Sequence, residues 1–127
     1  MSLETVRLSQ RGKEQLIKLK RVTGIKQWNV LCRWALCVSL ADPTPPLVRD
    51  ITTDSNVEMT WRTFAGSHGD VFLALLKRRC GQDAGYVNDA EVGRTLTVHL
   101  HRGIGVLAGD PRLLAIEDLT SYAHRMS

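Results

Sequence analysis

The 127-residue chain has few of the features that mark a disulfide framework, a membrane span or a secreted protein. Its three cysteines, Cys32, Cys37 and Cys80, form no Cys-x-x-Cys pair and have apolar neighbours, so we expect reduced, buried thiols. No apolar run approaches the roughly 18–20 residues that cross a bilayer, and the N-terminus lacks a signal-peptide pattern. These absences favour a cytoplasmic protein.

Catalytic, metal and nucleotide sites are not indicated either. His99 and His101 are two residues apart and point in different directions on a helix, so we expect surface or core histidines rather than a metal pair. Gly103-Ile104-Gly105 lies in a helical pattern, lacks a third glycine and follows no strand. We interpret it as a close backbone approach to another helix, within the subunit or across an interface. The sequence therefore predicts neither an enzyme nor a cofactor.

Length and composition predict one domain. A chain of 127 residues lies within the usual size of a single domain, and such a chain can bury a core without disulfides. We predict a mostly α fold, a compact helical domain with a ribbon-helix-helix-like N-terminal part. Residues 1–127 are divided into an N-terminal basic helix-turn-helix pair at 6–40, a loop at 41–68 and C-terminal helices at 69–127.

The N-terminal segment predicts a short strand followed by a helix. Val6-Arg7-Leu8 alternates apolar and charged residues, as a short strand does. Ser9 can accept a hydrogen bond from a free amide of the next turn and so cap a helix over residues 10–22. Gly24 can end that helix in the left-handed conformation. The residues that share its apolar face are Gly12, Leu16 and Leu19.

A second helix and a loop are expected next. Asn29 is a plausible cap for a helix that reaches about Leu40, and this helix is so apolar that nearly all of its circumference should be buried. Asp42-Pro43-Thr44-Pro45-Pro46 cannot continue it, because proline lacks the amide that a helix interior needs.

Three further helices are predicted after the loop. The first begins at Gly69-Asp70 and stops at Gly81, so that the basic triplet 77–79 lies in its last turn and complements the helix dipole. The second is capped by Asn88 and closes at Gly109. Asp110-Pro111 is expected to begin a short last helix, with proline at the first helical position.

The positive charge is concentrated near the N-terminus. Residues 1–40 contain eight basic and two acidic side chains, a net charge of +6, whereas the other residues contain nine basic and eleven acidic ones, a net charge of −2. A local excess of this kind is typical of an anion-binding surface. On the first helix Arg11, Lys18 and Arg21 gather on one flank, and Lys13 and Lys20 on another.

A strand, a basic helix, a glycine turn and a buried helix form the ribbon-helix-helix pattern, in which basic side chains and helix N-termini grip phosphates. A solvated basic helix face is the simpler interpretation, but charge and pattern together favour nucleic-acid binding. The three tryptophans are scattered, which favours contact with a duplex backbone over base stacking. The candidate DNA-binding residues are Arg7, Arg11, Lys13, Lys18, Lys20, Arg21 and Lys26.

The sequence NVLCRWALCVSL at 29–40, preceded by LKRVTGI at 19–25, resembles the DndE family. This family belongs to the bacterial DNA phosphorothioation system, which replaces a non-bridging phosphate oxygen with sulfur. FLALLKRR at 72–79 and HLHRGIGVLAG at 99–109 continue the resemblance in the same order. It covers most of residues 6–109, and nothing is carried over to the loop at 41–68 or to the tail after Asp110.

The resemblance implies a compact, mostly helical fold related to ribbon-helix-helix proteins, assembled as a homo-oligomer that we expect to be a tetramer. It also implies binding of DNA, notably nicked duplex, through surface lysines and arginines, whereas Arg33 in the apolar helix would serve structure. The implied partners are a cysteine desulfurase, an iron-sulfur protein and an ATPase, and no cofactor of its own is implied. The matching positions are Lys13, Lys18, Lys20, Arg21 and Lys26.

Three other functions stay open at this point. A ribbon-helix-helix transcriptional regulator would need strand residues that face bases, and Arg7 is the obvious candidate. A DNA-nicking enzyme would need a metal or a nucleophile. A scaffold that binds only protein partners would leave the basic face incidental.

Overall fold

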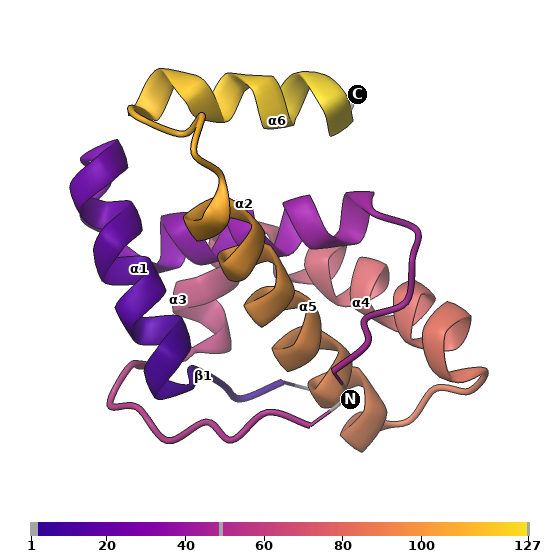
Figure 1. Ribbon diagram of the computed structural model, residues 1–127. Coiled ribbons are helices and arrows are strands. Elements are labelled where there is room, and N and C mark those ends of the chain that lie inside the picture. The colour runs from indigo at the N-terminus through magenta and orange to yellow at the C-terminus, as the bar shows by residue number, and fades with distance from the viewer. Residues whose placement is uncertain (1–2, 49, 127) are drawn as a thin grey trace.

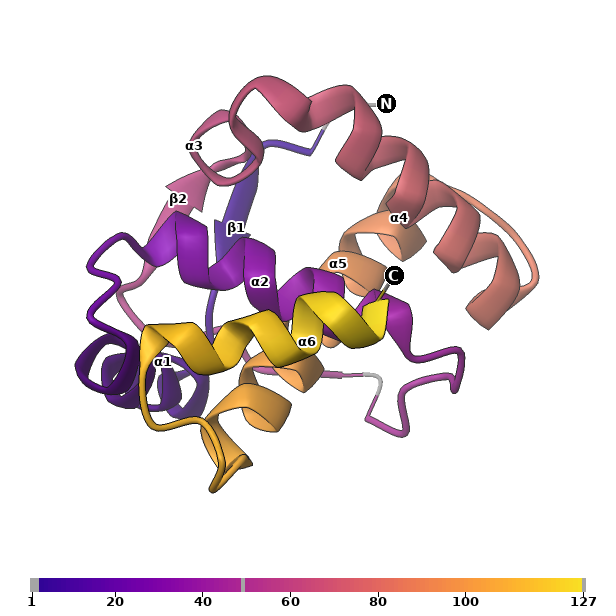
Figure 2. The same ribbon diagram turned by 90° about the horizontal axis from the view of Figure 1, so that it is seen from above.

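The computed structural model describes residues 3–48 and 50–126, with side chains up to residue 123 in the last helix. The fold is mostly helical and starts with a short antiparallel ribbon, which confirms the predicted class. Helices α1, α2 and α5 enclose the core, α4 packs on α5 to one side, and α6 runs alongside α2 (Figures 1 and 2). Over the described residues, no helix is both long and apolar enough to cross a bilayer.

The ribbon joins the N-terminus to the segment that was predicted to be a loop. Strand β1 (Thr5–Arg7) pairs antiparallel with β2 (Glu58–Thr60). The prediction of a loop over 41–68 is therefore wrong at its second half, which also contains α3 (Trp61–Ala65) and a 3-10 turn (Gly66–His68). A three-residue strand is stable here because it has a partner in β1, and no local pattern reveals that partner.

Helix α1 (Gln10–Thr23) follows its sequence signals closely. The Ser9 hydroxyl accepts from the amide of Gly12, and Gly24 ends the helix at φ 76°. The apolar face that includes Leu16 and Leu19 is buried. The predicted strand, cap, helix and stop are confirmed to within one or two residues.

Helix α2 (Trp28–Ala41) is buried or half-buried from Trp28 to Leu40, as its apolar sequence predicts. Its cap is Gln27, not Asn29, and no side chain bonds the first turn. The amide of Asn29 instead donates to the carbonyl of Thr63 at 3.1 Å, which connects α2 to α3. The cap prediction is wrong because a tertiary partner competes for that side chain.

Helix α5 (Asp89–Gly109) runs from its Asn88 cap to Gly109, both as predicted. It crosses α2 at Gly103, where an added Cβ would lie 1.7 Å from the carbonyl oxygen of Ala35. The glycine pair was interpreted as a close backbone approach, and the structure confirms this within the subunit for Gly103 alone, because a Cβ added at Gly105 would meet only the side-chain amide of Gln15 at 3.9 Å. Only a residue without a side chain allows the two backbones to meet here.

Helix α4 (Gly69–Ala84) continues past Gly81 and ends at Gly85, φ 83°, so the predicted stop is wrong. One interior glycine costs only about 1 kcal/mol, which the following residues offset. The basic triplet is consequently not in the last turn. Arg79 is buried instead, and its guanidinium binds Asp83 at 2.9 Å and the carbonyl oxygens of Leu40, Asp42 and Thr44.

The chain after α5 turns at Pro111 rather than entering a helix, so that prediction is wrong. A 3-10 turn (Ile116–Asp118) leads into α6 (Leu119–Met126), which buries Leu119 and Tyr122 against the core. Asp110 accepts hydrogen bonds from Arg112 and from the Tyr122 hydroxyl, and these bonds fix the turn. The three cysteines are free thiols, as predicted, but only Cys32 and Cys80 are buried, whereas Cys37 is half-buried. Burial raises the pKa of Cys32 to about 12.

Candidate nucleic-acid interface

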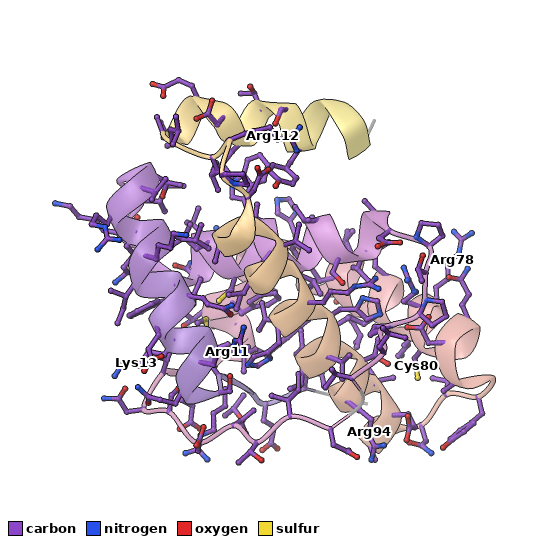
Figure 3. The ribbon with its side chains drawn as sticks, in the orientation of Figure 1. Arg11, Lys13, Arg78, Cys80, Arg94 and Arg112 are labelled. Carbon is purple, nitrogen blue, oxygen red and sulfur yellow. The ribbon has the colours of Figure 1, made fainter. Side chains whose placement is uncertain are left out.

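The basic residues of α1 lie on two sides of the helix because residues seven apart share a face. Lys13 and Lys20 are on the side that meets α2 and β2, whereas Arg11 and Lys18 are on the side toward α5. Figure 3 shows Lys13 and Arg11 pointing to opposite sides of α1. The two flanks predicted from the sequence therefore have different surroundings.

An open groove of about 600 Å³ lies between α1, the start of α2 and β2. Three of the predicted lysines line it. The ammonium of Lys13 donates to the side-chain oxygen of Asn56 at 2.6 Å, and that of Lys20 lies 3.6 Å from the centre of the Trp28 ring. We call this feature the lysine groove; its main lining residues are Lys13, Lys20, Lys26, Trp28, Asn56 and Glu58.

The second side of α1 carries exposed positive charge. Lys18 donates to the carbonyl of Ala108 at 2.7 Å, near the end of α5, where helix carbonyls have no intrahelical partner. Arg11 and Arg21 are exposed and have no hydrogen-bond or ion-pair partner among the described residues. Lys18 therefore supports the fold while keeping its charge, and the two arginines are available to a ligand.

Arg7 differs from the other candidates. The β1–β2 register places it opposite Glu58, and its guanidinium lies 3.3 Å from that carboxylate. Both side chains are about half exposed, so the pair adds little stability. The ion pair nevertheless cancels the charges of Arg7 and Glu58, so the two side chains together add no net charge to the site. Arg33 is a structural residue, as its place in the apolar helix predicted, because it donates to the carbonyl of Phe64.

Most arginines of the C-terminal half have acidic partners. Those that lie within 4.0 Å of a carboxylate are Arg79, Arg94, Arg102 and Arg112. Among the described residues, Arg62, Lys77 and Arg78 lack such partners, but they lie on α3 and α4. Figure 3 shows Arg78 on the opposite side of the molecule from Lys13. The uncompensated charge of α1 and the turn after it therefore lies on a different part of the chain from these three cations.

A buried polar network joins α2, α4 and α5 away from this surface. The hydroxyl of Ser39 is 2.8 Å from His99 Nδ1, and His99 Nε2 is 2.7 Å from Asp83. The three residue types resemble a hydrolase triad, but Ser39 is only 2% exposed and its oxygen also accepts from Arg102. No substrate can reach that oxygen, so the network is structural. Over the described residues, no group of three or more metal-ligating side chains comes together.

Sequence reasoning missed the neutral partners of the lysine groove, Asn56 above all. Asn56 lies in the segment predicted to be a loop, two residues before β2. The available signal was the alternation of apolar Val57, charged Glu58 and apolar Met59, which is the period of a strand. That signal indicates a strand but does not identify its partner.

Comparison with known protein families shows the family to which the chain belongs. The family model for DNA sulphur modification protein DndE matches residues 5–114, which run from β1 past the end of α5. The chain belongs to the DndE family. This confirms the resemblance seen in the sequence and gives the chain a role in the DNA sulphur modification system. No individual curated protein matches the chain. All residues of the lysine groove lie within the DndE match, and α6 lies outside it.

Proposed function

We propose that the chain is the DNA-binding component of the phosphorothioation system and that it binds duplex DNA through α1 and the turn that follows it. One observation carries the proposal. Arg11, Lys13, Lys18, Lys20, Arg21 and Lys26 have no acidic partner among the described residues, and all lie within 16 positions of each other. Cations without acidic partners, gathered on one helix and the turn after it, fit the phosphates of a nucleic acid.

The proposed contacts are with the DNA backbone rather than with bases. Lysine and arginine side chains that meet phosphates fix position without reading sequence. A nick gives the duplex bending freedom, so a protein that contacts phosphates on both sides of it pays less deformation energy there. We therefore propose a preference for nicked over intact duplex of the same sequence.

Assembly and partners complete the proposal. We propose a homo-oligomer, with a tetramer as the expected state, in which several copies of the basic surface hold one distorted duplex for sulfur transfer. The chemistry would come from the cysteine desulfurase, the iron-sulfur protein and the ATPase of the system, in the cytoplasm where the chromosome lies. We assign the chain no cofactor and no catalytic step of its own.

The alternatives have less support. A base-reading role for Arg7 conflicts with its ion pair to Glu58. A nicking activity would need an accessible nucleophile, and the Ser39 hydroxyl is buried and already bonded. A protein-only scaffold would not need an uncompensated basic surface.

Fluorescence anisotropy with intact and nicked duplexes of one sequence, at several salt concentrations, tests the proposal. We expect tighter binding to the nicked duplex, and log K should fall with log salt by about 0.9 for each phosphate neutralised. The double variant Arg11→Glu/Arg21→Glu should weaken binding about tenfold or more at 0.1 M salt and flatten this slope. Its matched control is Lys77→Glu/Arg78→Glu on α4, which makes the same change in net charge and should bind as the unaltered protein does.

Three results would count against the proposal. Equal affinity for nicked and intact duplex at every salt concentration removes the nick preference. Affinity that does not depend on salt removes the phosphate contacts. Equal losses in the α1 and α4 variants would mean that net charge, not this surface, determines binding.

A further inference from the structure

The lysine groove combines three ammonium groups with little opposing charge. Of the described residues that line it, Glu58 is the sole carboxylate, and Arg7 already neutralises it. The partners of Lys13 and Lys20 are an amide oxygen and an aromatic ring, both uncharged. The groove therefore keeps a net positive charge of about three, supplied by two lysines of α1 and one of the turn after it.

Two of the three lysines are also held in place. A free lysine side chain loses rotamer entropy when it binds a ligand, and a side chain that is already restrained loses less. The 2.6 Å hydrogen bond to Asn56 restrains Lys13, and the contact with Trp28 restrains Lys20. Lys26, on the turn between α1 and α2, is exposed at the edge of the same groove. The groove is thus pre-organised for an anion.

The net charge of the groove suits the doubly charged end of a DNA strand. Each internal phosphodiester of DNA carries one negative charge, and successive charges are spaced along the helix. A terminal phosphomonoester carries about −1.5 to −2 and offers three strong acceptor oxygens at one point. The lysines that line the groove can supply such a group with positive charge and with hydrogen-bond donors.

We propose that the lysine groove binds the terminal phosphate of a DNA strand at a nick. The inference rests on the proposed function, because it assumes that the surface around the groove binds DNA. It adds a second source of nick preference, which depends on the chemistry of the strand end and not on the flexibility of the duplex. Arg11 and Arg21 would then contact the continuous backbone, while Lys13, Lys20 and Lys26 bind the end.

Three nicked duplexes of one sequence test this inference by competition anisotropy at a single salt concentration. They carry a 5′-phosphate, a 3′-phosphate or only hydroxyl groups at the nick. We expect the protein to bind at least one phosphorylated nick about tenfold more tightly than the hydroxyl nick, because charged hydrogen bonds are added in a restrained site.

Neutralising one cation at a time separates the groove from the rest of the surface. Lys26→Gln should bring the affinity ratio of phosphorylated to hydroxyl nick close to one, and Lys13→Gln should reduce it. Arg21→Gln removes the same charge from α1 outside the groove, so it should weaken binding to all three duplexes and keep the ratio. Lys26 and Arg21 are both exposed, and unchanged circular dichroism spectra would show that the variants fold.

The outcomes are distinct. A ratio of one in the unaltered protein, with normal binding to the hydroxyl nick, overturns the inference and leaves the proposed function standing. A ratio that survives both Lys26→Gln and Lys13→Gln also overturns it, because the end would then bind elsewhere. Loss of the ratio in the groove variants alone supports it. Failure to bind any of the three duplexes would overturn the proposed function and this inference together.

Discussion

The crossing of α2 and α5 makes a sharp prediction about Gly103→Ala. An added Cβ at this position would lie 1.7 Å from the carbonyl oxygen of Ala35 and 2.4 Å from its carbonyl carbon, whereas ordinary contacts begin at 3.4 Å. Both atoms of Ala35 belong to a helix backbone, so no side-chain rotation can relieve the overlap. To reach an ordinary contact, the two helices must move apart by about 1.7 Å, the difference between 3.4 and 1.7 Å.

The expected loss of stability follows from what that separation opens. Overpacking by a methyl group in a core costs about 1–3 kcal/mol when neighbouring side chains can adjust. Here the adjustment must unpack buried residues on both helices, among them Leu36, Leu100 and Ile104. Replacing an interior helix glycine with alanine returns about 1 kcal/mol of helix propensity. We therefore expect a net loss of about 3 kcal/mol, or about 10 °C in Tm for a domain of this size.

Gly105→Ala is the matched control on the same helix. An added Cβ there would meet only the side-chain amide of Gln15, at 3.9 Å, so the variant keeps the propensity gain without a clash. Urea unfolding followed by circular dichroism would give the free energy of unfolding of each protein. We expect Gly105→Ala to equal or exceed the unaltered chain and Gly103→Ala to fall well below it. If the two variants were equally stable, the close approach of the helices would be refuted.

Two further predictions concern buried polar groups. Burial lowers the pKa of His99 and of His101, so the unfolded chain binds protons at a higher pH than the folded chain does. The free energy of unfolding should therefore fall as the pH drops below about 6.5. The slope is at most about 1.4 kcal/mol per pH unit for each histidine. His101→Gln should flatten this slope, and a stability that stays constant from pH 7 to pH 5 would contradict the reasoning. Arg79→Met removes the guanidinium that binds Asp83 and three carbonyl oxygens, and it should cost about 3–5 kcal/mol in thermal or urea unfolding. Arg78→Met, at the exposed neighbouring position, should change stability little, and equal effects of the two variants would show that the buried guanidinium is not special.

Local signals were enough to predict most of the helical frame. Ser9 and Asn88 cap their helices through side-chain oxygens that lie within three residues of the amides they accept from. Gly24 ends α1 by its own backbone freedom. The interpretation of Gly103 as a backbone contact also needed only its helical context, although the partner, Ala35, could not be named. Features that depend only on residues close together in the sequence can therefore be predicted from the sequence.

The predictions were wrong where a side chain contacts a residue that is distant in the sequence instead of a neighbour. Asn29 has the right type and position for a cap, but its amide binds the carbonyl of Thr63 instead. Arg79 was expected to complement the dipole of its own helix. It binds carbonyl oxygens at the end of α2, a helix with no basic residue in its last turn. Arg79 therefore does interact with the carbonyl end of a helix, as predicted, but that helix is α2 and not its own.

In the candidate site, too, the contacts that could not be predicted join residues that are distant in the sequence, and here they affect function. Sequence identified seven cations but could not rank them, because the rank depends on what each one meets in space. Arg7 meets Glu58 solely because the β1–β2 register sets them opposite each other; a slip of one residue would put an uncharged side chain there and leave both charges free. The same ribbon connects Asn56 to Lys13 across 43 positions. One short strand pairing therefore neutralises one predicted cation and positions another, which is why the lysine groove could be recognised only from the fold.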